Sequence, residues 1–241
     1  MVLGGGLYGV MFAVPIFVQD YLHFTATQSG LLLMPGAFAS AVAMIVMGKV
    51  SGRFDPRLLI AAGALLTMAT ALMLSDINPD TGTSTLFFPL ILRGLGGVMM
   101  FIPLSLATIG GLPKRDISAG SGFYSLMRQM GSSIGIALIT TALAHREAIH
   151  RAALVECINP YSVETAQRVQ VLTGAFAQRG GDPVAAKQQA FAVLDGAVNG
   201  QALLLSFADV FRYVAIAFVV TLPLLLLLGK PGNKEAAASA H

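Results

Sequence analysis

The sequence predicts an all-α polytopic membrane protein with six transmembrane helices, and three observations support this prediction. First, 55% of the 241 residues are hydrophobic and only 11% are charged, whereas soluble domains carry roughly 25% charged residues. Second, apolar segments close to the roughly 20 residues needed to cross a bilayer recur along the chain. Third, the loops between them alternate between basic and non-basic. The segments cover residues 2–19, 31–48, 58–75, 86–110, 119–143 and 207–229.

The fifth segment, residues 119–143, has the most informative pattern. Small and polar residues follow one helical face at steps of four, three, four and three. Gly131 and Gly135 form a GxxxG pair, which lets two helices approach closely in a membrane. Arg128 would lie about 14 Å into the span, at a cost of at least ~2.5 kcal/mol on insertion scales. We therefore expect this face to turn toward other helices or a cavity. The face comprises Ser121, Ser125, Arg128, Ser132 and Gly135.

The fourth segment, residues 86–110, combines Arg93 with a run of glycines and is interrupted by Pro103. A glycine run can signal a phosphate-binding loop. Here, however, no strand precedes the run and no Lys-Ser/Thr pair follows it, so nucleotide binding is not indicated. Close helix packing explains Gly94 and Gly97 better.

Residues 144–206 are far more polar than the rest and are expected to form a loop outside the membrane. Two amphipathic helices are predicted within the loop, at about residues 163–179 and 184–205, separated by an Arg-Gly-Gly-Asp-Pro sequence that should break a helix. These helices could lie on the membrane surface or cover the bundle. The sixth transmembrane helix, residues 207–229, follows the loop, and residues 230–241 form a short polar tail.

The basic residues predict how the chain is oriented. The loops at residues 49–57 and 111–118 contain Lys and Arg, as does the tail, whereas the loops at residues 20–29 and 76–85 contain neither. With six spans, these two groups of loops fall on opposite sides without exception. The positive-inside rule therefore puts both termini in the cytoplasm and residues 144–206 outside.

Composition and motifs disfavour several function classes. The fifteen Lys and Arg residues are scattered along the chain, which argues against nucleic-acid binding. The single cysteine, Cys157, excludes a disulfide framework and a multi-cysteine metal site. His145 and His150 lie five residues apart, but no further metal ligands accompany them. No Ser-His-Asp or paired-carboxylate pattern is present, so we expect neither enzymatic activity nor a metal or cofactor.

A proton-driven transporter needs a group that binds and releases protons within the membrane, typically Asp or Glu. Asp209 is the only acidic residue inside a predicted span. Arginine cannot serve, because its pKa stays above about 12. Arg93 and Arg128 would therefore line a cavity, tune a carboxylate elsewhere or contact substrate, or else lock helices through backbone carbonyls. Asp209 and Arg212 are spaced i, i+3, so an interfacial ion pair is the alternative to a proton site.

Soft and aromatic side chains within the spans could contact varied hydrophobic substrates. More often, such side chains pack against a neighbouring helix or face lipid. The candidates are Met99, Phe101 and Tyr124, together with Met11, Phe12, Met100 and Met127.

The basic loop GKVSGRFDPR at residues 48–57 resembles the loop motif of the major facilitator superfamily, Gly-x-Leu-Ala-Asp-Arg-x-Gly-Arg-Arg. Gly48, Arg53 and Arg57 match this motif, and Lys49 occupies a variable position. Asp55 stands where the family has Gly, and a glycine stands where it has Asp. The resemblance implies that this loop takes part in gating.

Four further stretches are similar to the EmrB/QacA group of that family, which are fourteen-helix drug:proton antiporters. They are GLYGVMFAVPIFVQ near the start, LLLMPGA at residues 31–37, AGSGFYSLMRQMGSSIGIAL at residues 119–138 and QALLLSFADVFR at residues 201–212. The resemblance covers essentially the whole chain and implies the C-terminal six-helix half of such a transporter, in the bacterial inner (plasma) membrane.

The resemblance also implies the export of hydrophobic or cationic small molecules in exchange for protons. Because Met1 would fall inside a helix of the family pattern, we expect the chain to be a fragment. Its expected partners are the lipid bilayer, hydrophobic substrates, the missing N-terminal half or a second copy, and a periplasmic adaptor. The alternative is a half that does not transport, either an inactive remnant or an interaction subunit that docks on such an adaptor.

Overall fold

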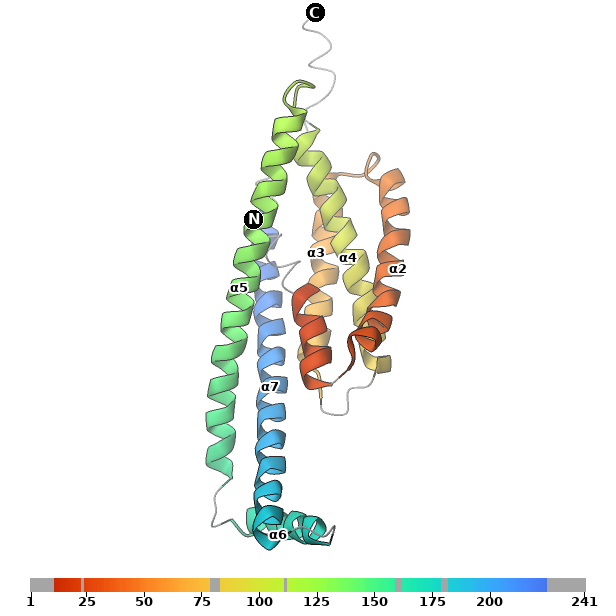
Figure 1. The fold of residues 1–241 in the computed structure, drawn as a ribbon. Helices are drawn as coiled ribbons and strands as arrows, with labels where there is room; N and C mark the ends of the chain where they lie inside the picture. Colours follow the sequence, from red (N-terminus) through yellow and green to blue (C-terminus); the bar gives the residue numbers. More distant parts are fainter. Residues whose placement is uncertain are drawn as a thin grey trace, which may run out of the picture.

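The computed structural model describes residues 11–22, 24–78, 83–110, 112–158, 162–178 and 182–224. The described residues are helical apart from short connections, which confirms the all-α prediction (Figure 1). Residues 11–16 are helical and lead into a π-helical turn, η1 (Phe17–Tyr21). The α-helices that follow are α2 (Ala26–Val50), α3 (Pro56–Ser75), α4 (Thr83–Ile109), α5 (Ile117–Cys157), α6 (Val163–Ala177) and α7 (Pro183–Leu224).

Local sequence explains where α2 and α3 begin. Thr25 and Gln28 form a capping box, in which Thr25 Oγ1 accepts a hydrogen bond from the Gln28 N–H at 3.3 Å and Gln28 Oε1 accepts one from the Thr25 N–H at 3.0 Å. This box starts α2 at Ala26, ahead of the predicted residue 31. Helix α3 begins with Pro56, immediately after the N-cap residue Asp55.

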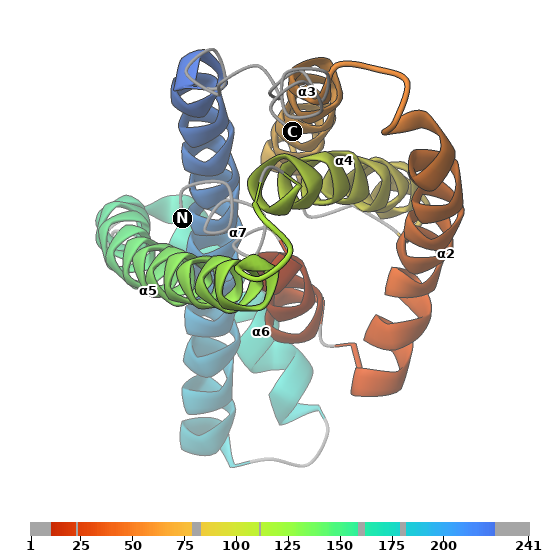
Figure 2. The same ribbon diagram turned by 90° about the horizontal axis from the view of Figure 1, so that it is seen from above.

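Helix α4 packs between α2 and α3, and glycine makes this close approach possible (Figure 2). A methyl group on Gly94 would collide with the backbone oxygen of Gly36 in α2. On the other side, a methyl group on Gly96 would lie 2.7 Å from Thr67 Oγ1 and 2.9 Å from the Gly63 carbonyl oxygen, both in α3. Small residues serve this purpose in membranes, where lipid removes the hydrophobic drive between helices and close backbone contact replaces it.

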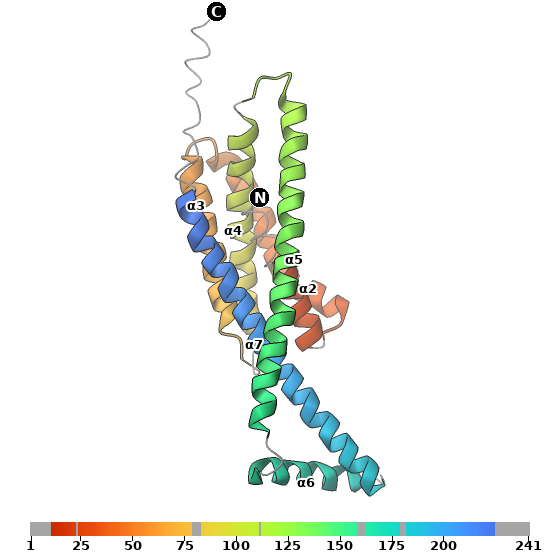
Figure 3. The same cartoon turned by 90° about the vertical axis from the view of Figure 1, so that its left-hand side faces the viewer.

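Helices α5 and α7 lie side by side and run past the other helices to α6, which crosses their far end (Figures 1 and 3). The structure corrects two predicted helix ends. Helix α5 continues to Cys157 instead of ending at residue 143, and α7 joins the predicted loop helix at residues 184–205 to the predicted span at residues 207–229. A drop in hydropathy indicates where a chain leaves the membrane, but it does not end a helix. Both helices continue because no helix-breaking sequence lies at either point.

Helix α6 corresponds to the predicted loop helix at residues 163–179. It starts after the N-cap residue Ser162, whose Oγ accepts a hydrogen bond from the Thr165 N–H at 3.3 Å. Pro183 then occupies the first position of α7, where its missing N–H costs no helical hydrogen bond.

Four helices of the described residues are long and apolar enough to cross a membrane, namely α2, α3, α4 and α7. Helix α5 is not among them, because Arg128, Gln129 and the small polar residues around them lower its hydropathy. Three predicted segments lie partly or wholly outside the described residues. They are the first span up to residue 10, the sixth span after residue 224, and the whole tail at residues 230–241.

The main hydrophobic core lies where η1, α3, α4 and α7 meet, and α5 packs against it. The rings of Phe17 and Phe207 meet edge to face with centroids 5.3 Å apart, and Phe211 extends this aromatic cluster along α7. On α2, by contrast, Phe38 is 73% exposed and Ile45 is 68% exposed. This pattern suits a helix whose outer face meets lipid and whose inner face meets α4.

Candidate functional site

A cavity of about 260 Å³ lies between α2, α4 and the N-terminal helix. Arg93 is the charged residue of its lining, and the Nη1 atom of Arg93 is buried without a hydrogen bond to any described residue. The other lining residues are apolar or small. They are Met11, Ser40, Gly94, Gly97, Val98 and Phe101.

The packing of α4 on α2 determines where Arg93 lies. Because Gly94 touches the backbone of Gly36, the preceding residue, Arg93, is held at the seam between the two helices. Ser40 lies across this seam, and its Oγ donates a hydrogen bond to the Gly36 carbonyl at 2.9 Å. That hydroxyl proton is therefore engaged within α2, and Arg93 is the charged side chain among the described residues that line the cavity.

A second arginine, Arg128 in α5, approaches Phe101 of the cavity lining. The guanidinium carbon of Arg128 lies 5.5 Å from the centre of the Phe101 ring, within cation–π distance. Close by, Ser105 Oγ in α4 donates a hydrogen bond to the Tyr124 hydroxyl in α5 at 3.1 Å. The structure thus brings Arg93, Phe101 and Arg128 together along one surface, which we name the arginine wall.

The remaining helix-interior candidates are divided among three places on α4 and α5. Met99 packs against a small cluster formed by Ala43, Met47, Leu59 and Val98, and does not line the cavity. Gly97 lines the cavity next to Arg93. On α5, Gly131 is buried and Gly135 is half-buried.

A polar cluster joins α5 to α7 around Asp209, whose side chain is only 17% exposed. Asp209 Oδ2 lies 2.8 Å from His150 Nε2 and 3.3 Å from Arg146 Nε, while Oδ1 lies 3.8 Å from Arg212 Nη1. Arg146 Nε also donates a hydrogen bond to the Tyr213 hydroxyl at 2.6 Å, and its guanidinium lies over the Tyr213 ring at 5.3 Å. We name these five residues the Asp209 cluster.

A second polar contact lies nearer to α6. Arg151 in α5 pairs with Asp195 in α7 at 2.8 Å and donates a hydrogen bond to Asn199 at 2.6 Å. Both charged side chains are about half exposed, at 49% and 55%. Water therefore screens this contact more than the Asp209 cluster.

Sequence reasoning paired Asp209 with Arg212 but missed the partners on α5. A signal for them was present, because Arg146 and His150 lie one helical turn apart, as do Asp209 and Tyr213. Two such pairs on neighbouring antiparallel helices can face each other, and the structure places them opposite one another.

The residues of the basic-loop motif lie at the connection between α2 and α3, at the end of the bundle opposite α6 (Figure 1). Gly48 and Lys49 are exposed in the last turn of α2, and Arg53 is exposed in the connection. Asp55 Oδ1 accepts a hydrogen bond from the backbone N–H of Arg57 at 3.0 Å. The aspartate that departs from the family motif thus caps α3.

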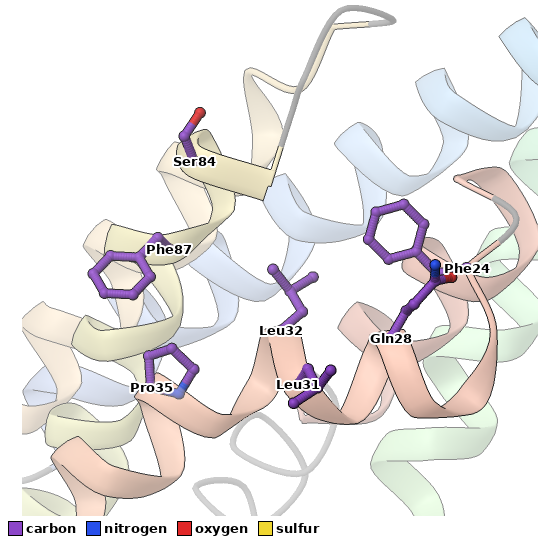
Figure 4. Close-up of a pocket in the computed structure, with 7 residues that line it drawn as sticks. All are labelled: Phe24, Gln28, Leu31, Leu32, Pro35, Ser84 and Phe87. Carbon is purple, nitrogen blue, oxygen red and sulfur yellow. The ribbon is translucent and has the colours of Figure 1, made fainter.

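A wider depression of about 670 Å³ lies near the N-terminal ends of α2 and α4 (Figure 4). None of the described residues that line it is charged, and these residues offer mainly apolar contact. They are Phe24, Gln28, Leu31, Leu32, Pro35, Ser84 and Phe87. Within the described ranges, no group of three or more His, Cys, Asp and Glu residues is arranged to hold a metal ion.

Comparison with known proteins adds a family and several relatives. The family model described as Major Facilitator Superfamily matches residues 1–136. The chain is 27% identical over 220 residues to the colistin resistance protein EmrB of Acinetobacter baumannii, covering 91% of this chain and 42% of that protein. It is 23% identical over 223 residues to the fatty acid resistance protein FarB of Neisseria gonorrhoeae, covering 92% and 42%.

The multidrug export protein EmrB of Escherichia coli K12 is 25% identical over 238 residues, covering 97% of this chain and 44% of that protein. The chain therefore spans less than half of the length of these relatives. The similarity extends beyond the part matched by the family model and includes the α5–α6–α7 region.

Proposed function

Because a family model matches more than half of its residues, this chain belongs to the major facilitator superfamily, and we propose that it forms one half of a proton-coupled exporter of hydrophobic small molecules. The arginine wall is the observation that carries this proposal. Charged residues inside apolar helices are costly, and they commonly mark a substrate or ion pathway. In transporters built from two such halves, the substrate path lies between the halves near the membrane midplane.

In the proposed exporter, the arginine wall forms this half's side of the substrate path. Phe101 supplies apolar surface, while Arg93 and Arg128 supply positive potential. The names of the relatives refer to multidrug export, colistin resistance and fatty acid resistance. These names support small-molecule export as the class of activity.

The proton-binding group of the exporter is proposed to lie in the part of the transporter beyond this chain. Three basic side chains surround Asp209, which supports a role in joining α5 to α7 rather than in carrying protons. In this proposal, Arg93 and Arg128 influence a carboxylate of the other half through their positive charge.

The proposed orientation has both termini in the cytoplasm of a bacterial cell and α6 outside the inner membrane. The α2–α3 and α4–α5 connections, which contain the basic loops, lie at one end of the bundle, and α6 lies beyond the other (Figure 1). This distribution supports the orientation, because basic residues are retained on the cytoplasmic side.

A second candidate function is an interaction subunit that transports nothing by itself. The observation that favours it is the projecting pair of α5 and α7, with α6 at its tip (Figure 3). On α6, Val163 is 70% exposed and Val171 is 71% exposed. Exposed apolar side chains at such a tip support docking on a periplasmic adaptor protein.

An efflux assay with the neutral dye Nile red tests the proposed function, in cells that produce either this chain alone or a longer transporter that contains it. We expect dye export that a protonophore abolishes, and we expect the Arg128→Ala variant to lose export at an unchanged membrane level. The Arg115→Ala variant is the control, because Arg115 lies in a loop with its side chain 86% exposed. Full export by the Arg128→Ala variant would refute a role for the wall, and the absence of export from both proteins would refute the function.

A further inference from the structure

Helix α2 has an exposed face that changes from apolar to basic as it nears the α2–α3 connection. Phe38 is 73% exposed, Val42 is 54% exposed and Ile45 is 68% exposed. Lys49 and Arg53 follow them, and both are exposed. Steps of four, three, four and four residues separate these five positions, which is the spacing of a single helical face. We name this face the α2 stripe.

Backbone hydrogen bonds keep Arg53 in line with the rest of the stripe. The Ser51 N–H donates to the Met47 carbonyl at 2.9 Å, and the Phe54 N–H donates to the Val50 carbonyl at 3.2 Å. Both bonds span four residues, as in an α-helix, so the chain continues to wind past the end of α2. Arg53 therefore lies about one turn beyond Lys49.

The opposite side of α2 is the one that packs on the bundle. Gly36, Ala43 and Met47 are buried there, and a methyl group on Gly36 would collide with the Leu90 carbonyl of α4. The α2 stripe consequently faces away from α3 and α4, toward whatever surrounds this half.

We propose that the α2 stripe binds an anionic glycerophospholipid. The phosphate-bearing head group would lie at Lys49 and Arg53, and an acyl chain would extend along Ile45, Val42 and Phe38. In the proposed orientation this lipid belongs to the cytoplasmic leaflet. The inference goes beyond the proposed export activity and does not depend on it.

The first argument is charge. Residues 21–54 contain no Asp or Glu, and the ion pairs among the described residues involve neither Lys49 nor Arg53. Asp55 follows closely in sequence, but its Oδ1 caps α3 through the Arg57 N–H. A lipid phosphate would supply the missing counter-charge, since basic side chains at the membrane surface attract anionic lipids.

The second argument is length. Phe38 and Lys49 are eleven positions apart, which corresponds to about 17 Å along a helix. One leaflet contributes roughly 15 Å to the hydrocarbon core. The apolar part of the stripe thus matches one acyl chain, and the basic part lies where the head group of the same lipid would be.

The third argument is the pair of apolar side chains beside the basic ones. Phe54 is 58% exposed and Leu58 is 66% exposed, and they flank the connection that contains Arg53. Exposed apolar side chains next to basic ones suit the boundary between acyl chains and head groups. A contact with water alone would leave these two side chains without apolar partners.

Tryptophan fluorescence tests the inference, because the chain contains no Trp. Val42→Trp places a single reporter midway along the stripe. The protein is reconstituted in phosphatidylcholine nanodiscs with a minor fraction of phosphatidylglycerol or phosphatidylcholine whose acyl chains carry bromine, which quenches tryptophan on contact. We expect phosphatidylglycerol to bind about tenfold more tightly than phosphatidylcholine, and about 1 M NaCl to reduce this preference.

Matched variants of the Val42→Trp protein assign the preference to the two basic residues. Lys49→Gln combined with Arg53→Gln should bring the ratio of the two affinities to about 1. Lys49→Arg combined with Arg53→Lys keeps both charges and should keep the preference. Lys114→Gln combined with Arg115→Gln removes two charges from the other basic loop, where Arg115 already lies 3.6 Å from Asp116, and should leave the ratio unchanged.

A reporter on another helix verifies that the effect is local. Ile216 on α7 is 59% exposed, and Ile216→Trp in the otherwise unchanged chain should report no preference between the two lipids. Circular dichroism of each variant verifies that the helices are retained. If the double Gln variant fails to fold, the comparison of the two reporters and the salt dependence still decide the inference.

Several results would overturn the inference. Equal affinity for the two lipids at Val42→Trp would remove the charge preference, and an unchanged preference in the double Gln variant would remove the role of Lys49 and Arg53. The same preference at Ile216→Trp would indicate a general lipid shell. Competition by free glycerol 3-phosphate would indicate a phosphate site, and loss of quenching in a longer transporter that contains this chain would show that the other half covers the stripe.

Discussion

Helices α2, α3 and α4 pack through glycine, whereas α5 and α7 are joined by charged side chains near the end that carries α6. In the first region, Gly94 and Gly96 place the backbone of α4 against both neighbours. In the second, Asp209 and Arg151 anchor contacts that reach from one helix to the other. Backbone contact suits a lipid environment, where apolar side chains gain nothing by leaving lipid for one another. Ion pairs suit the region where α5 and α7 leave the bundle.

The largest expected effect comes from breaking the glycine contact. Gly94→Ala should destabilise the chain by about 1–3 kcal/mol, because the new methyl group meets a backbone oxygen that cannot move aside. Gly122→Ala is the matched control, since nothing lies within 4 Å of that position. Thermal unfolding in detergent, followed by size-exclusion chromatography, measures both variants. Equal melting temperatures for the two variants would show that the close α2–α4 contact at Gly94 does not determine the stability of the chain.

The next effect comes from the Asp209 cluster. Asp209→Asn should cost about 1–2 kcal/mol, because a carboxylate that is only 17% exposed loses its charge among three basic side chains. The same unfolding experiment, run at about 0.05 M and about 1 M NaCl, should show a smaller deficit at high salt. The deficit of Gly94→Ala should not depend on salt. If the loss of stability in Asp209→Asn did not depend on salt, the α5–α7 contact could not be distinguished from the glycine contact as an electrostatic one.

The smallest effect is expected at the exposed ion pair. Asp195→Asn should cost less than about 0.5 kcal/mol, because both partners are about half exposed and water screens their charges. This substitution changes the same chemical group as Asp209→Asn, so the difference between the two variants reports the combined effect of burial and of the number of basic partners. A deficit as large as that of Asp209→Asn would show that neither burial nor the number of basic partners determines the strength of these contacts.

The sequence was a good guide to the helical class and to the membrane character of the fold, because apolar length and charge depletion are local properties. It was a poorer guide to the ends of α5 and α7. Polarity changes near residues 144 and 206, but the backbone continues as helix there because no residue at those points breaks it. Helix continuity and solvent exposure are separate properties, and only the second follows hydropathy.

For the site, sequence identified arginines in apolar helices but not what surrounds them. That Arg128 would approach the ring of Phe101 depends on the crossing of α4 and α5, which no local pattern specifies. The contact between His150 and Asp209 joins positions 59 residues apart and depends on the register of α5 against α7. Short-range pairs such as Asp209 and Arg212 were accessible, because one helix fixes their spacing.

Because α7 is one continuous helix, a movement of one of its ends can be transmitted to the other. Its 42 residues correspond to about 63 Å, roughly twice the thickness of the hydrocarbon core. A tilt of about 10° around its middle would move each end by about 5 Å in opposite directions. A rocking movement of the part of α7 within the membrane would therefore move α6. In the same way, a partner that binds and displaces α6 would move the far end of α7.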